Sequence, residues 1–324
     1  MAHGMKRRTV LAGLAALALA TRVWAAAQPR IVILHSGFPR RTPIDRLFEA
    51  LRALGYEDGR TATIALHGAE GDSARLTALV AQIAAETPDV VIGLTTPAVG
   101  ALKQGGVTAP VVFAFVSDPV ALGIVASLAR PGANFTGVSY SDAVLGGKRL
   151  ELLADALPGM RRLAVLWGRQ FPDNQAIVAN ITGAASTRGI EVVSRALDGP
   201  DDLAAAFADA ARVGAQGAIF LSDNTLLSHR KEIAALALRH RLPSMHSYLF
   251  EVEDGSLMYY GPDIDESYRR VAALADRILK GARPANLPVE EPTVFRLAIN
   301  LKTASAFGIT IPPTLLARAD EVIE

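Results

Sequence analysis

Residues 31–34 read IVIL and residues 44–55 read IDRLFEALRALG, and this pair of segments decides the fold class. The first is an unbroken apolar run, which is typical of a strand buried on both faces of a sheet. In the second, apolar residues recur at three- and four-residue steps from Ile44 to Leu54, before Gly55. This spacing predicts an amphipathic helix that ends at a glycine. A buried strand followed by such a helix predicts an α/β protein with a parallel sheet.

The same order of strand and helix continues outward from this segment. Further apolar runs begin at Val90 and Val111, and a second series begins at Leu163, which lies 132 residues after Ile31. Alternating strands and helices build open, doubly wound sheets. The pattern therefore predicts two doubly wound parallel-sheet lobes of similar plan, although two successive α/β units of separate origin would give the same pattern.

The chain is expected to cross between the lobes several times, which would make a multi-strand hinge. A turn cluster at 130–134 precedes a β-prone segment, and the apolar run 257–260 precedes a helical pattern. A hinge of this kind permits the lobes to close on a ligand. We expect an N-terminal lobe of residues 28–138 to which residues 262–290 return, and a C-terminal lobe of residues 139–261 with residues 291–324 as a crossing and tail.

The first 27 residues have the three regions of a secretory signal peptide. Basic residues at 6–8 precede an uncharged apolar run at 10–20, and three alanines follow at 25–27. The apolar run is too short for a permanent membrane anchor. We expect cleavage near Ala27 and export to the periplasm, and the paired arginines leave both the general secretory and the twin-arginine routes open.

Composition excludes several classes of protein. The whole chain has a formal net charge of +1, but removal of the signal leaves 29 basic and 32 acidic residues, a net charge of −3. This balance gives no support for nucleic-acid binding. The chain has no cysteine, so we expect neither disulfides nor a lipid-modified cysteine. A monomer is the simplest state to expect.

Motifs of catalysis and metal binding are missing from the sequence. It contains no G-x-S-x-G elbow, no phosphate-binding loop, no G-x-G-x-x-G fingerprint and no histidine pair at metal spacing. We therefore expect no catalytic residues, no metal and no cofactor.

Candidate binding residues follow from a topological rule, because ligands of open α/β sheets bind beyond the carboxyl ends of the strands. The polar and aromatic residues at these ends in both halves are Ser36, Gly37, Thr95, Thr96, Ser117, Asp118, Trp167, Asp223, His246 and Tyr248.

Several of these candidates admit two interpretations. Thr96, followed by a proline, can cap a helix or present that helix start to an anion such as a carboxylate. Asp118 can cap its own helix or accept a hydrogen bond from a ligand amine, and Asp223 is its counterpart in the second half. If both acids face one cleft, an amino-acid-like zwitterion satisfies the anion and cation sites together.

Longer motifs extend over most of the chain beyond the signal. They include PVVFAFVSDPV at 110–120, RPGANFTGVS at 130–139 and IPPTLLARADE at 311–321. These segments resemble the ABC-transporter substrate-binding family that includes tryptophan- and tyrosine-type binding proteins, which have the type I periplasmic-binding fold. The resemblance implies an amino-acid or related small ligand, an ABC permease of the inner membrane as partner, and contacts from Thr95, Thr96, Asp118 and Asp223.

The sequence thus indicates a periplasmic solute-binding protein of an ABC importer, which captures a small ligand between its lobes by hinge closure. Two other functions fit the same fold. One is an extracytoplasmic sensor subunit that presents the ligand to a signalling partner. The other is an exported α/β enzyme whose residues converge only in the folded cleft.

Overall fold

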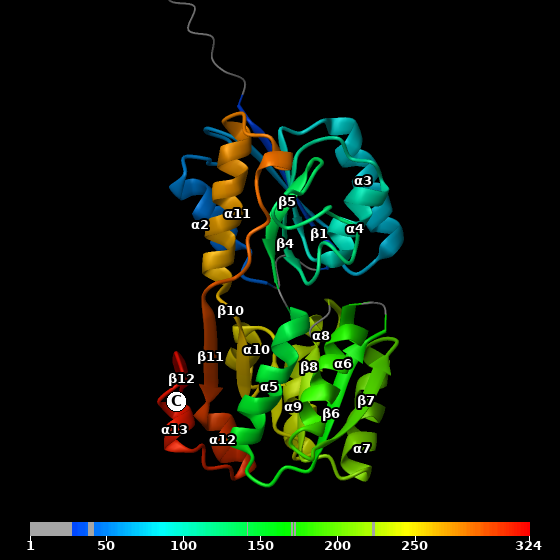
Figure 1. Ribbon diagram of the computed structural model, residues 1–324, viewed down its shortest axis with the longest axis vertical. Helices are drawn as coiled ribbons and strands as arrows, with labels where there is room; N and C mark the ends of the chain where they lie inside the picture. The colour runs from blue at the N-terminus through cyan, green and yellow to red at the C-terminus, as the bar shows by residue number, and fades with distance from the viewer. Residues whose placement is uncertain (1–27, 38–41, 141, 170, 172, 222–223) are drawn as a thin grey trace, which may run out of the picture.

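The computed structural model describes residues 28–37, 42–140, 142–169, 171, 173–221 and 224–324. The expected signal peptide and Asp223 lie outside these residues. The described chain forms two α/β lobes that are stacked along the long axis of the molecule (Figure 1). The prediction of two doubly wound lobes is therefore confirmed.

The first lobe is built on a five-stranded parallel sheet in the order β2-β1-β3-β4-β5. Its central strands are buried because helices cover both faces, which explains their unbroken apolar sequences. The strands are β1 (Arg30–His35), β2 (Thr63–Gly68), β3 (Val90–Leu94), β4 (Val111–Val116) and β5 (Phe135–Ser139).

Two pairs of helices enclose this sheet. On one face lie α3 (Ser73–Glu86) and α4 (Thr96–Gln104), and on the other lie α2 (Asp45–Ala53) and α11 (Ile264–Leu279). The residues of α11 come from late in the chain, yet the helix packs against α2 and β4. Its buried stripe includes Tyr268 and Val271, which join the core beneath β1 and β3.

The second lobe contains a seven-stranded sheet in the order β12-β11-β10-β9-β8-β6-β7. All neighbouring strands are parallel except β10 and β11. These two are antiparallel because β10 leads out of the lobe and β11 leads back into it. The strands are β6 (Arg162–Gly168), β7 (Glu191–Leu197), β8 (Gly217–Leu221), β9 (Ser244–His246), β10 (Met258–Pro262), β11 (Phe295–Asn300) and β12 (Glu321–Ile323).

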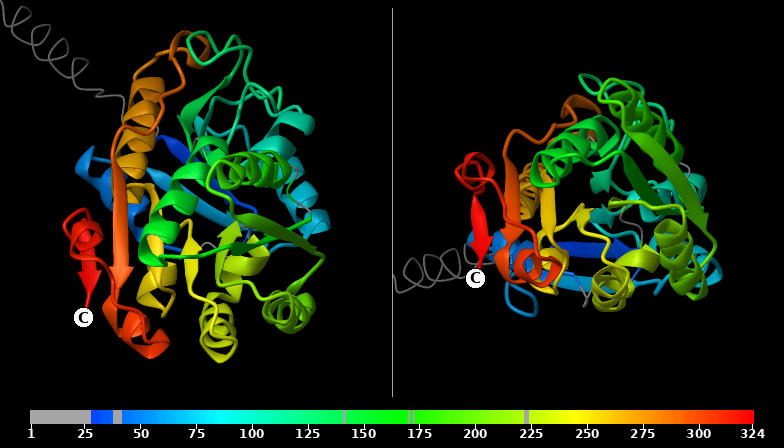
Figure 2. Two further views of the ribbon diagram at one scale, coloured as in Figure 1. Left: turned by 60° about the horizontal axis from the view of Figure 1, so that its bottom comes forward. Right: turned by 90° about the horizontal axis from the view of Figure 1, so that it is seen from below.

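Helices also cover both faces of the second sheet. The longer ones form two packed layers, α5 (Asp142–Ala156) with α6 (Asp173–Ser186), and α7 (Leu203–Arg212) with α9 (Arg230–Arg239). Figure 2 shows the C-terminal strand β12 beside β11 at the outer edge of the sheet. The short elements are α8 (Asn224–Ser228), α10 (Leu249–Glu253), α12 (Leu301–Phe307), α13 (Pro313–Leu316), η2 (Pro200–Asp202) and η3 (Pro284–Asn286).

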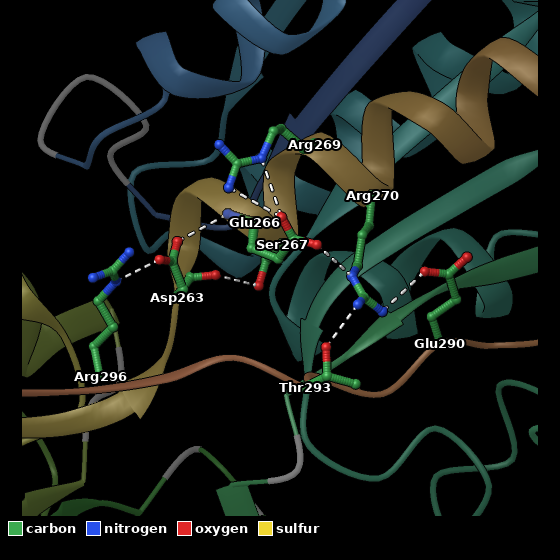
Figure 3. Close-up of polar contacts among 8 residues, drawn as sticks. All are labelled: Asp263, Glu266, Ser267, Arg269, Arg270, Glu290, Thr293 and Arg296. Carbon is green, nitrogen blue, oxygen red and sulfur yellow. Dashed lines mark hydrogen bonds and ion pairs between the residues drawn. The ribbon is translucent and has the colours of Figure 1, made fainter.

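Three segments connect the lobes: the one between β5 and α5, the one between β10 and α11, and the one that precedes β11. Polar contacts join the second and third of these segments (Figure 3). Asp263, which is 8% exposed, caps α11 by accepting from the Glu266 N–H and pairs with Arg296 of β11 at 2.5 Å. Burial of the Asp263 carboxyl raises its pKa, but these two hydrogen bonds outweigh that effect and leave the pKa below its ordinary value.

Arg270 makes a second set of contacts in the same region. Its guanidinium pairs with Glu266 at 3.0 Å and Glu290 at 3.3 Å, and it donates to the Thr293 hydroxyl at 2.7 Å. The start of α11 is therefore fastened to the chain that returns to the second lobe, so the two segments form one connected unit.

Candidate ligand-binding site

A cavity of about 810 Å³, including part of its opening to solvent, lies between the two lobes at the carboxyl ends of the strands. Both lobes contribute to its wall, which is the position expected for the ligand of an open α/β sheet. The first lobe and its connections supply His35, Thr42, Pro43, Thr95, Thr96, Phe115, Ser117, Tyr140, Ile264 and Tyr268. The second lobe supplies Phe171, Asn174, Ile177, Leu227, Ser247, Tyr248 and Phe250.

Aromatic rings from both lobes form one wall of the cavity. The ring of Phe115 lies edge-on to those of Tyr140, Tyr248 and Tyr268, with centroids 5.6, 6.4 and 5.4 Å away. Phe250 stacks on Tyr248 at 5.4 Å. Such a wall can enclose a flat or apolar group through contact area and edge-to-face attraction.

Phe115 reaches this position through an unusual backbone. Its φ is +58°, in the left-handed region that bulky residues rarely occupy. The pairing of β4 with β5 also shifts register between Phe113 and Val116. Non-glycine residues in this region persist where the surrounding structure imposes them, commonly at ligand sites. The irregularity here coincides with the point at which β4 lines the cavity.

Another part of the lining carries hydrogen-bonding groups from the first lobe, beside the strand end that holds Phe115. Helix α4 begins at the cavity, and the side chain of its N-cap residue, Thr95, makes no capping hydrogen bond to the helix. The Thr95 hydroxyl instead bonds to the Ser36 hydroxyl at 2.6 Å. A helix start attracts an anionic or electron-rich group, because the first N–H groups and the positive end of the helix dipole point toward it.

His35 is held neutral at this wall. Its side chain is 5% exposed, and its Nδ1 accepts a hydrogen bond from the Gly37 N–H at 2.8 Å. Burial lowers the pKa of His35 to about 4. Because Nδ1 accepts, the proton of the neutral ring lies on Nε2.

The described cavity residues include no aspartate, glutamate, lysine or arginine. Burial also raises the pKa of Tyr268 above its ordinary value, so its hydroxyl stays neutral. A cavity lined in this way suits a ligand that has no net charge. It also suits a ligand with two opposite charges, if each charge meets neutral hydrogen-bonding groups.

The structure brings together some of the residues predicted from the sequence. Thr95, Thr96, Ser117 and Tyr248 line the cavity. Ser36 and Gly37 lie directly behind it, since Ser36 bonds to Thr95 and Gly37 bonds to His35.

Three other candidates are engaged elsewhere. Asp118 caps the turn that follows it, accepting from the Val120 and Ala121 N–H groups at 3.1 and 2.9 Å. The Trp167 indole lies in the core of the second lobe and donates to the Ser194 hydroxyl at 2.8 Å. The third candidate is His246. Asp118, Trp167 and His246 are not among the residues that line the cavity.

His246 supports the site from behind. It is fully buried, with Nε2 2.9 Å from the Ser244 hydroxyl and Nδ1 3.0 Å from Glu251. The second oxygen of Glu251 accepts from the backbone N–H of Tyr248 at 3.0 Å. His246 therefore contacts the segment that carries the aromatic wall without lining the cavity itself.

Sequence reasoning missed several cavity residues. Phe115 lies inside a predicted strand, and Asn174 and Tyr268 lie on helices that are distant in sequence. No local pattern marks these three as neighbours.

The described part of the chain has neither a membrane-spanning helix nor a cluster of metal-binding side chains. Outside the gaps named above, no helix is long and apolar enough to cross a membrane. The same residues contain no cluster of three or more histidine, aspartate or glutamate side chains arranged to hold a metal ion.

Comparisons with known proteins give consistent matches over most of the chain. The family model for ABC transporter substrate binding proteins matches residues 33–323. The tyrosine-binding protein of Clostridioides difficile (strain R20291) is 24% identical over 262 residues, which are 81% of this chain and 75% of that relative.

Two solved structures share the whole two-lobed arrangement. A conserved domain protein from Vibrio cholerae has 27% identity and a TM-score of 0.85, covering 91% of this chain and 99% of its own. The ABC domain in complex with L-Trp from Streptococcus pneumoniae has 25% identity and a TM-score of 0.84, covering 92% of this chain and 100% of its own.

Proposed function

The chain belongs to the ABC transporter substrate-binding protein family, and on this basis we propose that it captures an amino acid with an aromatic or other apolar side chain. Proteins of this family bind small-molecule ligands and work with ABC permeases, generally outside the cytoplasm, and the family is not one of enzymes. The expected type I periplasmic-binding fold agrees with this membership.

The observation that carries the proposal is the composition of the cavity between the lobes. The lining offers the rings of Phe115, Tyr248 and Phe250 and also the start of α4. An amino acid has an apolar side chain for the rings and a carboxylate for the helix start. The tyrosine-binding relative and the tryptophan-bound structure support an aromatic side chain.

The mechanism is capture by closure. Because the ligand contacts both lobes only when they are together, binding shifts the population toward the closed form. The permease then distinguishes closed from open protein. In the described structure Tyr140, which follows β5, donates its hydroxyl proton to the Ser247 carbonyl at 2.7 Å and so joins the lobes beside the cavity.

We further propose that the protein acts in the periplasm as a monomer after cleavage of the signal near Ala27, without a lipid anchor and without nucleic acid. The proposed lobes are residues 28–138 with 262–290, and residues 139–261 with 291–324. The distribution of strands between the two sheets and the packing of α11 against α2 support this division.

Calorimetry on the mature protein, beginning at Gln28, tests the proposal. We expect saturable binding of L-tryptophan or L-tyrosine, and weaker binding of L-glutamate and L-lysine, because the described lining residues offer no charged partner for their side chains. Sugars and dipeptides serve as comparison ligands. Binding of a sugar with no response to any amino acid would overturn the proposed ligand class.

Matched tyrosine variants test the site. Tyr248→Ala removes part of the aromatic wall and should weaken amino-acid binding about 10-fold or more. Tyr56→Ala is the control, since Tyr56 is not among the residues that line the cavity and its hydroxyl donates to Asp276. Equal effects of the two variants would place the ligand elsewhere.

A further inference from the structure

Two polar side chains in the cavity wall each have one atom committed to the protein and one atom without a partner among the described residues. The first is His35 of the first lobe. Its Nδ1 accepts from the Gly37 N–H, while Nε2 carries the proton and makes no hydrogen bond within the described chain. The ring is 5% exposed and lines the cavity, so Nε2 is not sealed in the core.

The second is Asn174, near the start of α6 in the other lobe. Its Nδ2 donates to the Gly168 carbonyl at 3.2 Å, which assigns the remaining atom, Oδ1, as an acceptor. Within the described chain Oδ1 has no hydrogen-bond partner, although the residue is only 4% exposed and lines the same cavity. Neither atom is among the fully buried atoms that lack a partner, so both can be reached from the cavity, where a few placed polar groups typically fix the orientation of a ligand.

We propose that His35 and Asn174 recognise opposite ends of a zwitterion: His35 Nε2–H donates to the ligand carboxylate, and Asn174 Oδ1 accepts from the ligand ammonium group. This inference rests on the proposed function and deepens it, because it assigns the ligand an orientation. The carboxylate faces the first lobe, where the start of α4 also lies, and the ammonium group faces the second lobe.

The pairing has a consequence for closure. The donor and the acceptor belong to different lobes, so a ligand that carries both charged ends bonds across the cleft, whereas a ligand with one end bonds to one lobe. Both recognising groups are neutral, which suits a ligand without net charge. The low pKa of His35 keeps the ring neutral throughout the physiological range.

Three ligands with one ring system provide the test: L-tryptophan, indole-3-propionate, which lacks the amine, and tryptamine, which lacks the carboxylate. If the wild type prefers L-tyrosine, the matched set is L-tyrosine, 3-(4-hydroxyphenyl)propionate and tyramine. Affinities are measured by calorimetry for the wild type, His35→Asn, His35→Gln and Asn174→Ala. His229→Asn and Asn286→Ala are the controls, because they change the same residue types outside the cavity.

His35→Asn keeps an acceptor for the Gly37 N–H but removes the donor to the cavity, and His35→Gln keeps a donor at the distance of Nε2. We expect His35→Asn to weaken the amino acid and the carboxylate analogue about 10- to 100-fold, with tryptamine or tyramine little changed, and His35→Gln to restore part of the loss. Asn174→Ala should weaken the amino acid and the amine analogue by a similar factor and spare the carboxylate analogue.

The outcomes distinguish a failure of the proposed function from a failure of the assigned ligand orientation. If the wild type binds no amino acid with an aromatic or other apolar side chain, the proposed function fails and this inference with it. If the wild type binds an amino acid but the variants weaken all three ligands equally, or none, the function stands and the assigned orientation is wrong. Thermal melts without ligand show whether each variant is folded, since a loss caused by unfolding affects all three ligands alike.

Discussion

The buried neutral histidine makes the stability of this protein depend on pH in a defined direction. The folded-state pKa of His35 is about 4, against an ordinary value of 6.5 for the unfolded chain. Between these values the unfolded state binds more protons than the folded state, so the free energy of unfolding falls as the pH is lowered. The contribution of His35 is fully present above pH 6.5 and is lost progressively toward pH 4.

The size of the effect follows from the two pKa values. Their difference corresponds to about 3 kcal/mol, and lowering the pH from about 7.5 to about 4.5 should remove about 2.5 kcal/mol of this. The measurement is urea denaturation of ligand-free protein across this range, for the wild type and for His35→Asn. Subtracting the two curves removes the contributions of all the other titrating groups.

We expect the difference in the free energy of unfolding between the wild type and His35→Asn to shrink by about 2.5 kcal/mol as the pH falls, because only the wild type must protonate a buried imidazole. Parallel curves would refute the assignment of a neutral, buried His35. A titration of the wild type by NMR gives an independent answer that does not rely on the variant. A His35 resonance that titrates near pH 6.5 would contradict the structural argument.

Two further substitutions test other parts of the structure. Asp118→Ala removes a cap from the Val120 and Ala121 N–H groups, so it should lower the free energy of unfolding by about 1 kcal/mol and leave amino-acid affinity in calorimetry nearly unchanged; a 10-fold loss of affinity would return its carboxylate to the site. Arg296→Gln breaks the contact with Asp263 and should cost about 1 kcal/mol in urea denaturation near neutral pH. The Arg296→Gln deficit should begin to shrink near pH 3.8, the ordinary pKa of Asp263, and disappear once the pH has fallen through the lowered pKa of Asp263 in the folded protein, because the protonated carboxyl no longer needs the guanidinium. A deficit of constant size over that range would show that Arg296 acts through packing.

The central strands were predictable because each is buried on both faces. The apolar runs at Ile31, Val90, Val111 and Leu163 all became strands of the two sheets. In contrast, β2 and β7 lie at sheet edges and are only partly buried, so their sequences carry no continuous apolar signal. The strands β11 and β12 depend on a return of the chain to the second lobe, which no local pattern specifies.

For the candidate site, the sequence by itself determined which ends of the strands face the cavity. Thr95, Thr96 and Ser117 follow buried strands, and the parallel arrangement alone places them at the cavity. The sequence could not determine whether each side chain points into the cavity or bonds to its own backbone. Asp118 occupies an equivalent position, yet its carboxylate is used by its own backbone N–H groups, which lie two and three residues away.

Only the tertiary structure decided the composition of the cavity. Phe115 faces the cavity because its own left-handed backbone and the register shift beside it turn the end of β4. Tyr268 reaches the cavity because α11 returns to the first lobe. Asn174 becomes the counterpart of His35 only when the lobes come together. Local periodicity reports which residues are buried, whereas a site between lobes depends on contacts between segments more than a hundred residues apart, and these are set by packing of the whole chain.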